Sequence, residues 1–184
     1  LIEPMIEFAR QLAELAPGAV QKSFFCNSGT EAIDTALLTA KLHTGAEDII
    51  AVRHSYHGRS HVAIGVSGQK PWRLPVATMG NVHFTHNAYC YRCAFGLTYP
   101  SCELRCARDL EELLQTSTSA RIAAFIPEPI QGVGGFITPP PEYFQIIYEI
   151  VKRYGGLTIA DEVQTGWGRT GQKLFGIQHW NVEP

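Results

Sequence analysis

Apolar residues recur at helical spacing in several segments of the chain. Four segments are predicted to be helices: residues 1–15, 28–44, 110–114 and 142–154. Gly45 and Gly155 directly follow two of them, and glycine commonly ends a helix. By contrast, residues 70–106 are rich in Pro, Gly, Tyr and Cys. We expect that stretch to be an excursion with little regular structure.

Short segments with apolar residues separate these helical segments and predict strands. The four predicted strands are residues 20–26, 48–52, 122–126 and 157–160. Strands that alternate with helices are typical of an α/β fold with an open, mostly parallel sheet flanked by helices. In such sheets ligands bind beyond the carboxyl ends of the strands. Polar residues that follow the predicted strands are therefore the candidate site residues.

Composition narrows the class of protein. The chain has 184 residues, of which 45% are hydrophobic and 17% charged, as in a globular domain with an apolar core. The net charge of −2 and the lack of any run of Lys or Arg argue against binding to nucleic acid. Its apolar runs are too short to span a bilayer, and its first residues lack a basic leader. We therefore expect a cytoplasmic protein without a membrane or nucleic-acid partner.

The start of the helix predicted at residues 28–44 is a candidate phosphate site. Ser28 and Glu31 have the spacing of a capping box, so the turn at Gly29 and Thr30 presents free N–H groups at the positive end of the helix. An ordinary capped helix is the alternative. The chain has no GxGxxG segment and no Walker lysine, so a dinucleotide or nucleoside triphosphate is poorly supported.

Further candidates follow two other strands. Tyr56 lies in a loop and could present its ring to a flat ligand, while His54, His57 and His61 lack the spacing of a helical metal site. Glu128 stands between two prolines, before glycines that permit close approach of the backbone to a ligand. Each of these residues can equally have a structural role.

The strand predicted at residues 157–160 ends in two adjacent carboxylates, Asp161 and Glu162. A carboxylate at the end of a buried strand needs a positive partner, which is either a salt bridge or a cofactor cation. One such cation is a pyridinium nitrogen, whose protonation makes the ring an electron sink. Together the four strand-end segments predict a ligand that has a phosphate, a flat ring and a ring cation.

Four segments, SGTEA (28–32), YHGR (56–59), EPIQGVGG (128–135) and DEVQTGWGRTG (161–171), resemble in this order the class III aminotransferases of the fold-type I pyridoxal phosphate enzymes. The resemblance implies that residues 1–184 are part of the cofactor-binding large domain. It places the N-terminal segment, the Schiff-base lysine and the C-terminal small domain outside this chain, which alone should be inactive. It also implies pyridoxal phosphate as cofactor, an amino donor, a 2-oxo acid acceptor and a homodimer.

The same resemblance implies roles for individual residues. Asp161 would pair with the ring nitrogen as the catalytic residue, Tyr56 and Val163 would cover the two ring faces, and Gln164 would reach the phenolic oxygen, oriented by Glu128. Glu162 is expected to be a loop or network carboxylate. The full cofactor-binding set that the resemblance implies is Ser28, Gly29, Thr30, Tyr56, His57, Glu128, Asp161, Val163 and Gln164.

Val133 bears on the substrate. Family members that act on 4-aminobutyrate or ornithine often carry a glutamate at this position, so the resemblance favours alanine–glyoxylate type 2 and ω-amino acid–pyruvate aminotransferases, with the 4-aminobutyrate type next. The expected acceptor is pyruvate, glyoxylate or 2-oxoglutarate. A decarboxylating relative and an inactive scaffold are alternatives. The Schiff-base lysine is expected beyond Pro184, because the five lysines of the chain (Lys22, Lys41, Lys70, Lys152 and Lys173) lie outside the expected position.

Four cysteines suggest a second, independent site. Cys90 and Cys93 form a C-x-x-C pair, and Cys102 and Cys106 form a pair with three intervening residues. Four thiolates could hold zinc or an iron–sulfur cluster, which the resemblance also allows at a subunit interface. Small apolar filler is the alternative. A metal-binding interaction module without catalysis is the corresponding rival function.

Overall fold

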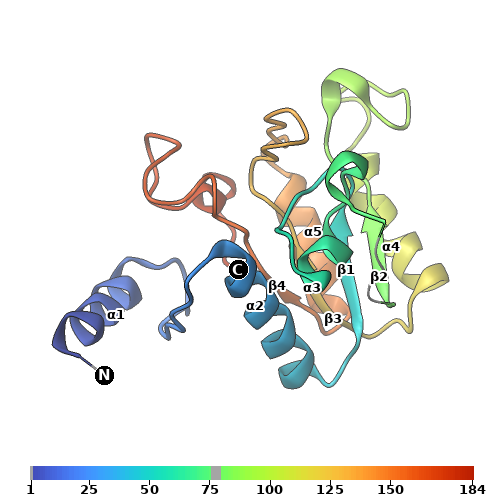
Figure 1. Cartoon of the computed structure of the whole chain (residues 1–184). Helices are drawn as coiled ribbons and strands as arrows, with labels where there is room; N and C mark the ends of the chain where they lie inside the picture. The colour runs from blue at the N-terminus through green and yellow to red at the C-terminus, as the bar shows by residue number, and fades with distance from the viewer. Residues whose placement is uncertain (1, 76–79) are drawn as a thin grey trace.

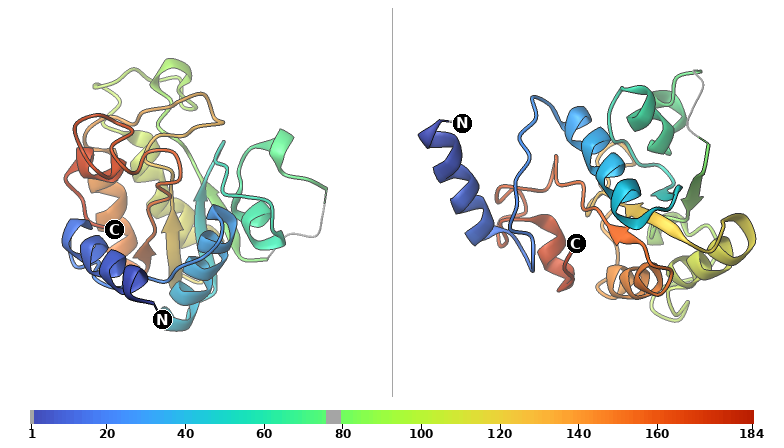
Figure 2. Two further views of the ribbon diagram at one scale, coloured as in Figure 1. Left: turned by 60° about the vertical axis from the view of Figure 1, so that its left-hand side comes forward. Right: turned by 90° about the horizontal axis from the view of Figure 1, so that it is seen from below.

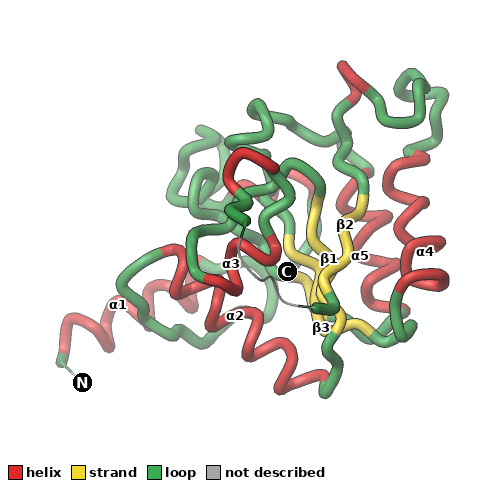
Figure 3. The backbone as a smooth tube through the Cα atoms, turned by 45° about the vertical axis from the view of Figure 1, so that its right-hand side comes forward, coloured by secondary structure: helices red, strands yellow, loops and turns green. Residues whose placement is uncertain are grey.

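The computed structural model describes residues 2–75 and 80–184. Its centre is a parallel sheet with the strand order β2-β1-β3-β4, seen in Figure 3 between layers of helix. The strands are β1 (Asp48–Val52), β2 (Val82–Thr85), β3 (Ile122–Ile126) and β4 (Leu157–Thr158). The predicted fold class, a mostly parallel open sheet flanked by helices, is confirmed.

Helices cover both faces of the sheet. The α-helices are α1 (Glu3–Leu15), α2 (Gly29–Thr44), α3 (His61–Val66), α4 (Arg105–Ser117) and α5 (Tyr143–Arg153). Three short 3-10 helices are η1 (Lys70–Trp72), η2 (Cys90–Arg92) and η3 (Gly176–Trp180). Figure 1 shows α2 and α3 on one face and α4 and α5 on the other, whereas α1 lies apart from the sheet, as the right-hand view of Figure 2 also shows. None of the described helices is long and apolar enough to cross a membrane.

The two layers of core explain why β3 and residues 49–52 of β1 are apolar. Ile50 and Val52 of β1 pack in the cluster that contains α4 and α5, while Ile49 and Ala51 pack with α2 and α3. Successive side chains of a strand point to opposite faces, so a strand covered on both faces must be apolar throughout. This is the pattern from which both strands were predicted.

Two predicted strands differ in the structure. Residues 20–26 are not a strand, and Phe24 there is 78% exposed, because the segment runs past the sheet without joining it. Of the strand predicted at 157–160, only Leu157 and Thr158 form a regular strand, and Leu157 is 38% exposed. β4 is the edge strand of the described sheet, so its burial is incomplete.

The loop regions contain more structure than predicted. The stretch 70–106 includes β2, two 3-10 helices and the start of α4, which is 13 residues long rather than the short helix expected at 110–114. The helix α3 was missed because its sequence, HVAIGV, combines glycine with β-branched residues that disfavour helix. Burial of its Ala63 and Val66 in the core cluster shared with β1 and α2 stabilises it instead.

The topology places the candidate residues together. β1, β3 and β4 are parallel, so their carboxyl ends lie at one edge of the sheet. Tyr56 follows β1, Glu128 follows β3 and Asp161 follows β4, and the N-terminus of α2 reaches the same edge. This is where an open parallel sheet binds ligands.

Candidate active site

The N-terminus of α2 forms the first wall of the site. The Ser28 side chain accepts a hydrogen bond from the Glu31 N–H at 3.2 Å, and Glu31 in turn accepts from the Asn27 N–H at 2.7 Å. In the usual capping box the acidic side chain accepts the N–H of the cap residue itself. Here Glu31 accepts the N–H of Asn27, one residue before the cap. Gly29 and Thr30 follow the cap, and N–H groups in this first turn lack intrahelical acceptors.

Glycine lets the loop after β1 approach this turn. Gly58 has φ +133°, and a Cβ added there would lie 2.4 Å from the Thr30 Oγ1. A Cβ added to Gly29 would lie 3.0 Å from a methyl group of Val163. The segments around Thr30, Gly58 and Val163 can pack this closely only because Gly29 and Gly58 have no side chain.

Asp161 is the buried charge of the site, with a side chain only 3% exposed. Its Oδ2 lies 2.6 Å from the Nδ1 of His57, and its Oδ1 accepts the N–H of Val163 at 3.1 Å. The Asp161 N–H donates to the carbonyl of Pro127 at 2.9 Å, which extends the pairing of β3 and β4 beyond the strands. The sheet itself thus fixes the direction of this carboxylate.

Glu128 ties two loops together beside Asp161. Its carboxylate accepts the N–H groups of Tyr56 and Gly132, each at 2.9 Å. Burial raises the pKa of Glu128, opposed by these two N–H groups and by His57, while the charge of Asp161 raises it further. Glu128 thereby sets the position of the Tyr56 loop and of the glycine-rich turn.

The ring of Tyr56 and the amide of Gln164 complete the walls. Tyr56 packs edge-to-face against Trp72 of η1, with the ring centroids 5.5 Å apart, which orients its ring. A Cβ on Gly132 would lie 2.4 Å from the Gln164 amide oxygen, so Gln164 lies directly on the backbone of the turn that Glu128 holds.

These residues enclose one cavity of about 240 Å³. Its lining is Ser28, Gly29, Thr30, Tyr56, His57, Gly58, Glu128, Asp161, Val163 and Gln164. The structure thus brings together all nine residues predicted to bind the cofactor. The sequence analysis assigned no role to Gly58 or Gly132, although Gly58 stands inside the YHGR segment and Gly132 inside the glycine-rich one.

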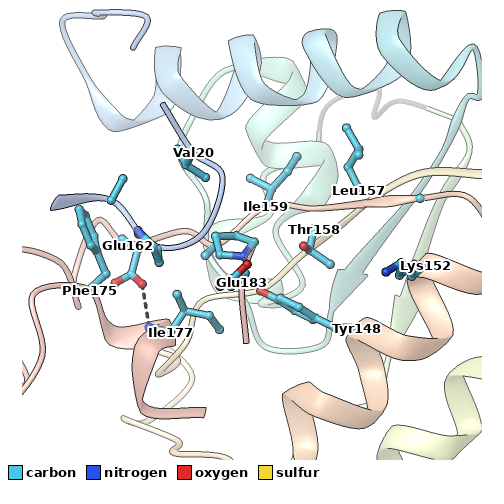
Figure 4. A pocket seen from close by; sticks show the side chains of 15 residues that line it. Val20, Tyr148, Lys152, Leu157, Thr158, Ile159, Glu162, Phe175, Ile177 and Glu183 are labelled. Atoms are coloured by element: carbon cyan, nitrogen blue, oxygen red, sulfur yellow. Dashed lines mark hydrogen bonds between the residues drawn. The ribbon is translucent and has the colours of Figure 1, made fainter. Parts of the chain in front are cut away.

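Glu162 points away from this cavity. It accepts the N–H groups of Gly176 and Ile177, each at 2.8 Å, and the hydroxyl of Thr165. Figure 4 shows its bond to Ile177. Glu162 therefore fixes the start of η3, as expected for a network carboxylate, and Asp161 alone of the two acids faces the ligand site.

The comparison with protein families decides what kind of site this is. The family model described as aminotransferase class-III matches residues 1–184, the whole chain. The chain belongs to the class III aminotransferase family. Its four motif segments are those that line the cavity at the carboxyl edge of the sheet.

Two curated relatives of the chain are named for different reactions, transamination and racemisation. The chain is 45% identical over 178 residues to alanine–glyoxylate aminotransferase 2 homolog 2, mitochondrial, of Arabidopsis thaliana, covering 97% of this chain and 36% of that protein. It is 35% identical over 185 residues to the leucine/methionine racemase of Thermococcus litoralis, covering 100% of this chain and 41% of that protein. The predicted cytoplasmic location stays a prediction, since one relative is named as mitochondrial.

Solved structures agree with this assignment. A thermostable (S)-enantioselective omega-transaminase from Thermomicrobium roseum superposes with a TM-score of 0.92 at 36% identity, covering 100% of this chain and 42% of that one. The chain therefore spans less than half the length of each of these three relatives.

The metal site predicted for this aminotransferase chain at Cys90, Cys93, Cys102 and Cys106 is not supported. Within residues 2–75 and 80–184, no group of three or more His, Cys, Asp or Glu could hold a metal ion. Burial, together with the neighbouring thiols, raises the pKa of Cys106 to about 11. Cys106 packs against the core beside α5, as apolar filler does.

A larger cavity of the aminotransferase chain, about 680 Å³, lies at the open edge of β4 (Figure 4). Its lining is mainly apolar and includes Leu157, Ile159, Phe175 and Ile177. Of its polar groups, Glu162 is already bound to the backbone of η3. It contains none of the nine predicted cofactor residues, so the smaller cavity is the candidate active site.

Proposed function

We propose that this chain is the cofactor-binding part of the large domain of a pyridoxal phosphate-dependent aminotransferase. The full-length enzyme would transfer an amino group from an amino acid or ω-amino acid to a 2-oxo acid. The observation that carries the proposal is the single cavity in which a helix N-terminus, an aromatic ring and a buried carboxylate meet.

The dimensions and chemistry of the cavity fit the cofactor. A phosphate suits the first turn of α2, where backbone N–H groups and the helix dipole favour an anion. A flat ring suits the space between Tyr56 and Val163, both of which line the cavity. Asp161 has one described partner on each oxygen, and a carboxylate oxygen can accept two hydrogen bonds, so it can also accept a ring N–H.

The residues of the chain then have distinct tasks. Bound pyridoxal phosphate would supply an electron sink for the substrate carbon that loses its proton. Asp161 keeps the ring nitrogen protonated, because a buried anion stabilises an adjacent cation. Gln164, whose side chain lies against the glycine-rich turn that Glu128 holds in place, would contact the cofactor.

The remaining parts of the proposal concern the full-length protein. We place the Schiff-base lysine and the small domain outside residues 1–184 and expect a homodimer. Val133 stands where the resemblance implies a glutamate in members of the 4-aminobutyrate type, and it favours an alanine or ω-amino acid donor. The identity of 45% to a protein named as an alanine–glyoxylate aminotransferase homologue supports alanine and glyoxylate as the first pair to assay.

Racemisation is the second candidate function, because one relative at 35% identity is named as a leucine/methionine racemase. The two reactions differ in their need for an acceptor. Transamination consumes one 2-oxo acid for each amino acid converted, whereas racemisation proceeds without any. Assays of the full-length protein with alanine or leucine, with and without glyoxylate, separate the two.

The test of the proposed function uses adjacent carboxylates as a matched pair. Asp161→Asn in the full-length protein should retain the fold but lose activity about a hundredfold or more, since a neutral amide cannot hold the ring nitrogen protonated. Glu162→Gln, which changes the neighbouring carboxylate outside the cavity, should keep activity within a few-fold. Equal activity of the two variants would show that Asp161 has only a structural role.

A further inference from the structure

The short helix η1, which carries Trp72, is attached to the sheet at both of its ends. Before η1, the N–H of Gly68 donates to the carbonyl of Ser55 at 3.0 Å, which ties this segment to the loop after β1. After η1, the guanidinium of Arg73 lies over the ring of Phe84 in β2, 5.0 Å from its centroid. The backbone around Trp72 is therefore fixed relative to the strands.

This placement brings the indole of Trp72 against the ring of Tyr56. The two rings are inclined at 61° with their centroids 5.5 Å apart, which is the edge-to-face arrangement that aromatic pairs prefer. The N–H of Tyr56 is held by Glu128 at 2.9 Å, but a backbone bond leaves the ring free to turn about its own torsions. Trp72 is the aromatic contact that restricts those torsions.

The two sides of the cavity that face each other are thus fixed in different ways. On one side, the N–H of Val163 is bonded to Asp161 at 3.1 Å, and Val163 packs on Gly29, which has no side chain to displace it. On the other side, the position of the Tyr56 ring depends on a contact between two side chains. The second side can therefore be altered by a single substitution outside the cavity.

We infer that Trp72 is a positioning residue, which acts through Tyr56 to set the space between Tyr56 and Val163 and thereby the affinity of the protein for pyridoxal phosphate. This inference rests on the proposed function, which places the cofactor ring in that space. Trp72 is not among the residues that line the cavity, so it need not touch the cofactor. Its side chain is 43% exposed, so its replacement removes less buried apolar area than that of a core residue.

The contact can be measured without the cofactor. The tyrosine rings of the full-length apo-protein are labelled with ¹³C, and Tyr56→Phe identifies the Tyr56 signals by their loss. Trp72→Leu should shift these signals, because the indole no longer lies against the ring. Tyr91→Leu is the control, since Tyr91 also stands within a 3-10 helix and packs against a tyrosine, Tyr89, outside the cavity. Unchanged Tyr56 signals in Trp72→Leu would overturn the inference, whether or not the protein binds the cofactor.

Titration of the apo-protein with pyridoxal phosphate tests the effect on the site. Trp72→Leu should weaken binding about twofold to tenfold, the usual worth of an aromatic pair. Trp72→Phe, which can still meet Tyr56 edge to face, should restore most of this loss, and Tyr91→Leu should bind as the wild type does. Equal affinity of Trp72→Leu and the wild type would overturn the positioning role, whereas a wild type that binds no cofactor would instead refute the proposed function.

A double-mutant cycle separates action through Tyr56 from support of the fold. Tyr56→Leu removes the ring on which Trp72 acts but keeps the α2 turn and Asp161. In this background Trp72→Leu should cause no further loss of cofactor affinity, because the two residues act as a pair. The same fold-change in both backgrounds would show that Trp72 acts independently of Tyr56, and it would overturn the inference.

Discussion

The adjacent residues Asp161 and Glu162 have different roles because their side chains point to different sides of the chain. Asp161 lines the cavity, whereas Glu162 bonds to the start of η3. The partners follow from this geometry. Asp161 retains acceptor positions toward the cavity, while Glu162 is occupied by backbone N–H groups.

Gly58 provides a prediction at the residue scale. Gly58→Ala in the full-length protein should weaken pyridoxal phosphate binding, because its Cβ would meet the Thr30 Oγ1 and force the loop away from the α2 turn. Titration of the apo-protein with the cofactor measures the effect. Gly96→Ala is the control, since Gly96 also has positive φ but its added Cβ would meet nothing within 4 Å. If both variants bind the cofactor equally well, close packing at Gly58 is not required.

The identity of the site residues was predictable from the sequence, but their contacts were not. Ser28, Asp161 and Glu128 could be identified because each follows or precedes a regular element whose pattern is clear. The bond from His57 to Asp161 joins residues far apart in the chain, and the contact of Gly132 with Gln164 depends on the shape of two loops. Such contacts depend on tertiary packing, which spacing along the chain does not specify.

At the scale of elements, Asp48 connects the start of β1 to its neighbours. It accepts the N–H and the hydroxyl of Ser119, before β3, and bonds to His83 of β2 at 3.2 Å. Burial alone would raise the pKa of Asp48, but the Ser119 hydrogen bonds and His83 outweigh it and lower the pKa below its ordinary value of 3.8. The ionised form is therefore the one that the fold stabilises.

This shift predicts a pH-dependent loss of stability in Asp48→Asn. Because the pKa is lower in the folded state, the contribution of Asp48 is fully present above pH 4–5 and declines as the pH falls through the folded-state value. At pH 7 the variant should lose about 1–2 kcal/mol of unfolding free energy, the usual worth of hydrogen bonds to a charged group. Urea denaturation at pH 7 and at pH 3 measures it. A difference that stays constant between these pH values would contradict the assignment.

Elements with a complete apolar face were predicted better than the others for a physical reason. Helices α2 and α5 and strands β1 and β3 bury complete faces, so their apolar patterns are unambiguous. Helix α3 and strand β2 are short and are stabilised by packing against the sheet rather than by their own sequence. Residues 20–26 have the apolar pattern of a strand but lack a neighbouring strand in the described structure.

At the scale of the whole molecule, the parallel sheet is what assembles the site. Four segments that are distant in the sequence reach one edge because β1, β3 and β4 run in the same direction. The order of the motifs along the chain therefore predicted both the fold and the site. The cysteine spacing specifies separations along the chain and not the geometry of the four thiols, and the metal site predicted from it is not supported among the described residues.

The most direct test of the account is a crystal structure of the full-length protein with pyridoxal phosphate bound. We expect the phosphate at the N–H groups of Gly29 and Thr30, the ring between Tyr56 and Val163, and the ring nitrogen about 2.7–3.2 Å from an Asp161 oxygen. A cofactor bound in this cavity with its ring nitrogen directed away from Asp161, or bound elsewhere in the protein, would contradict the central claim.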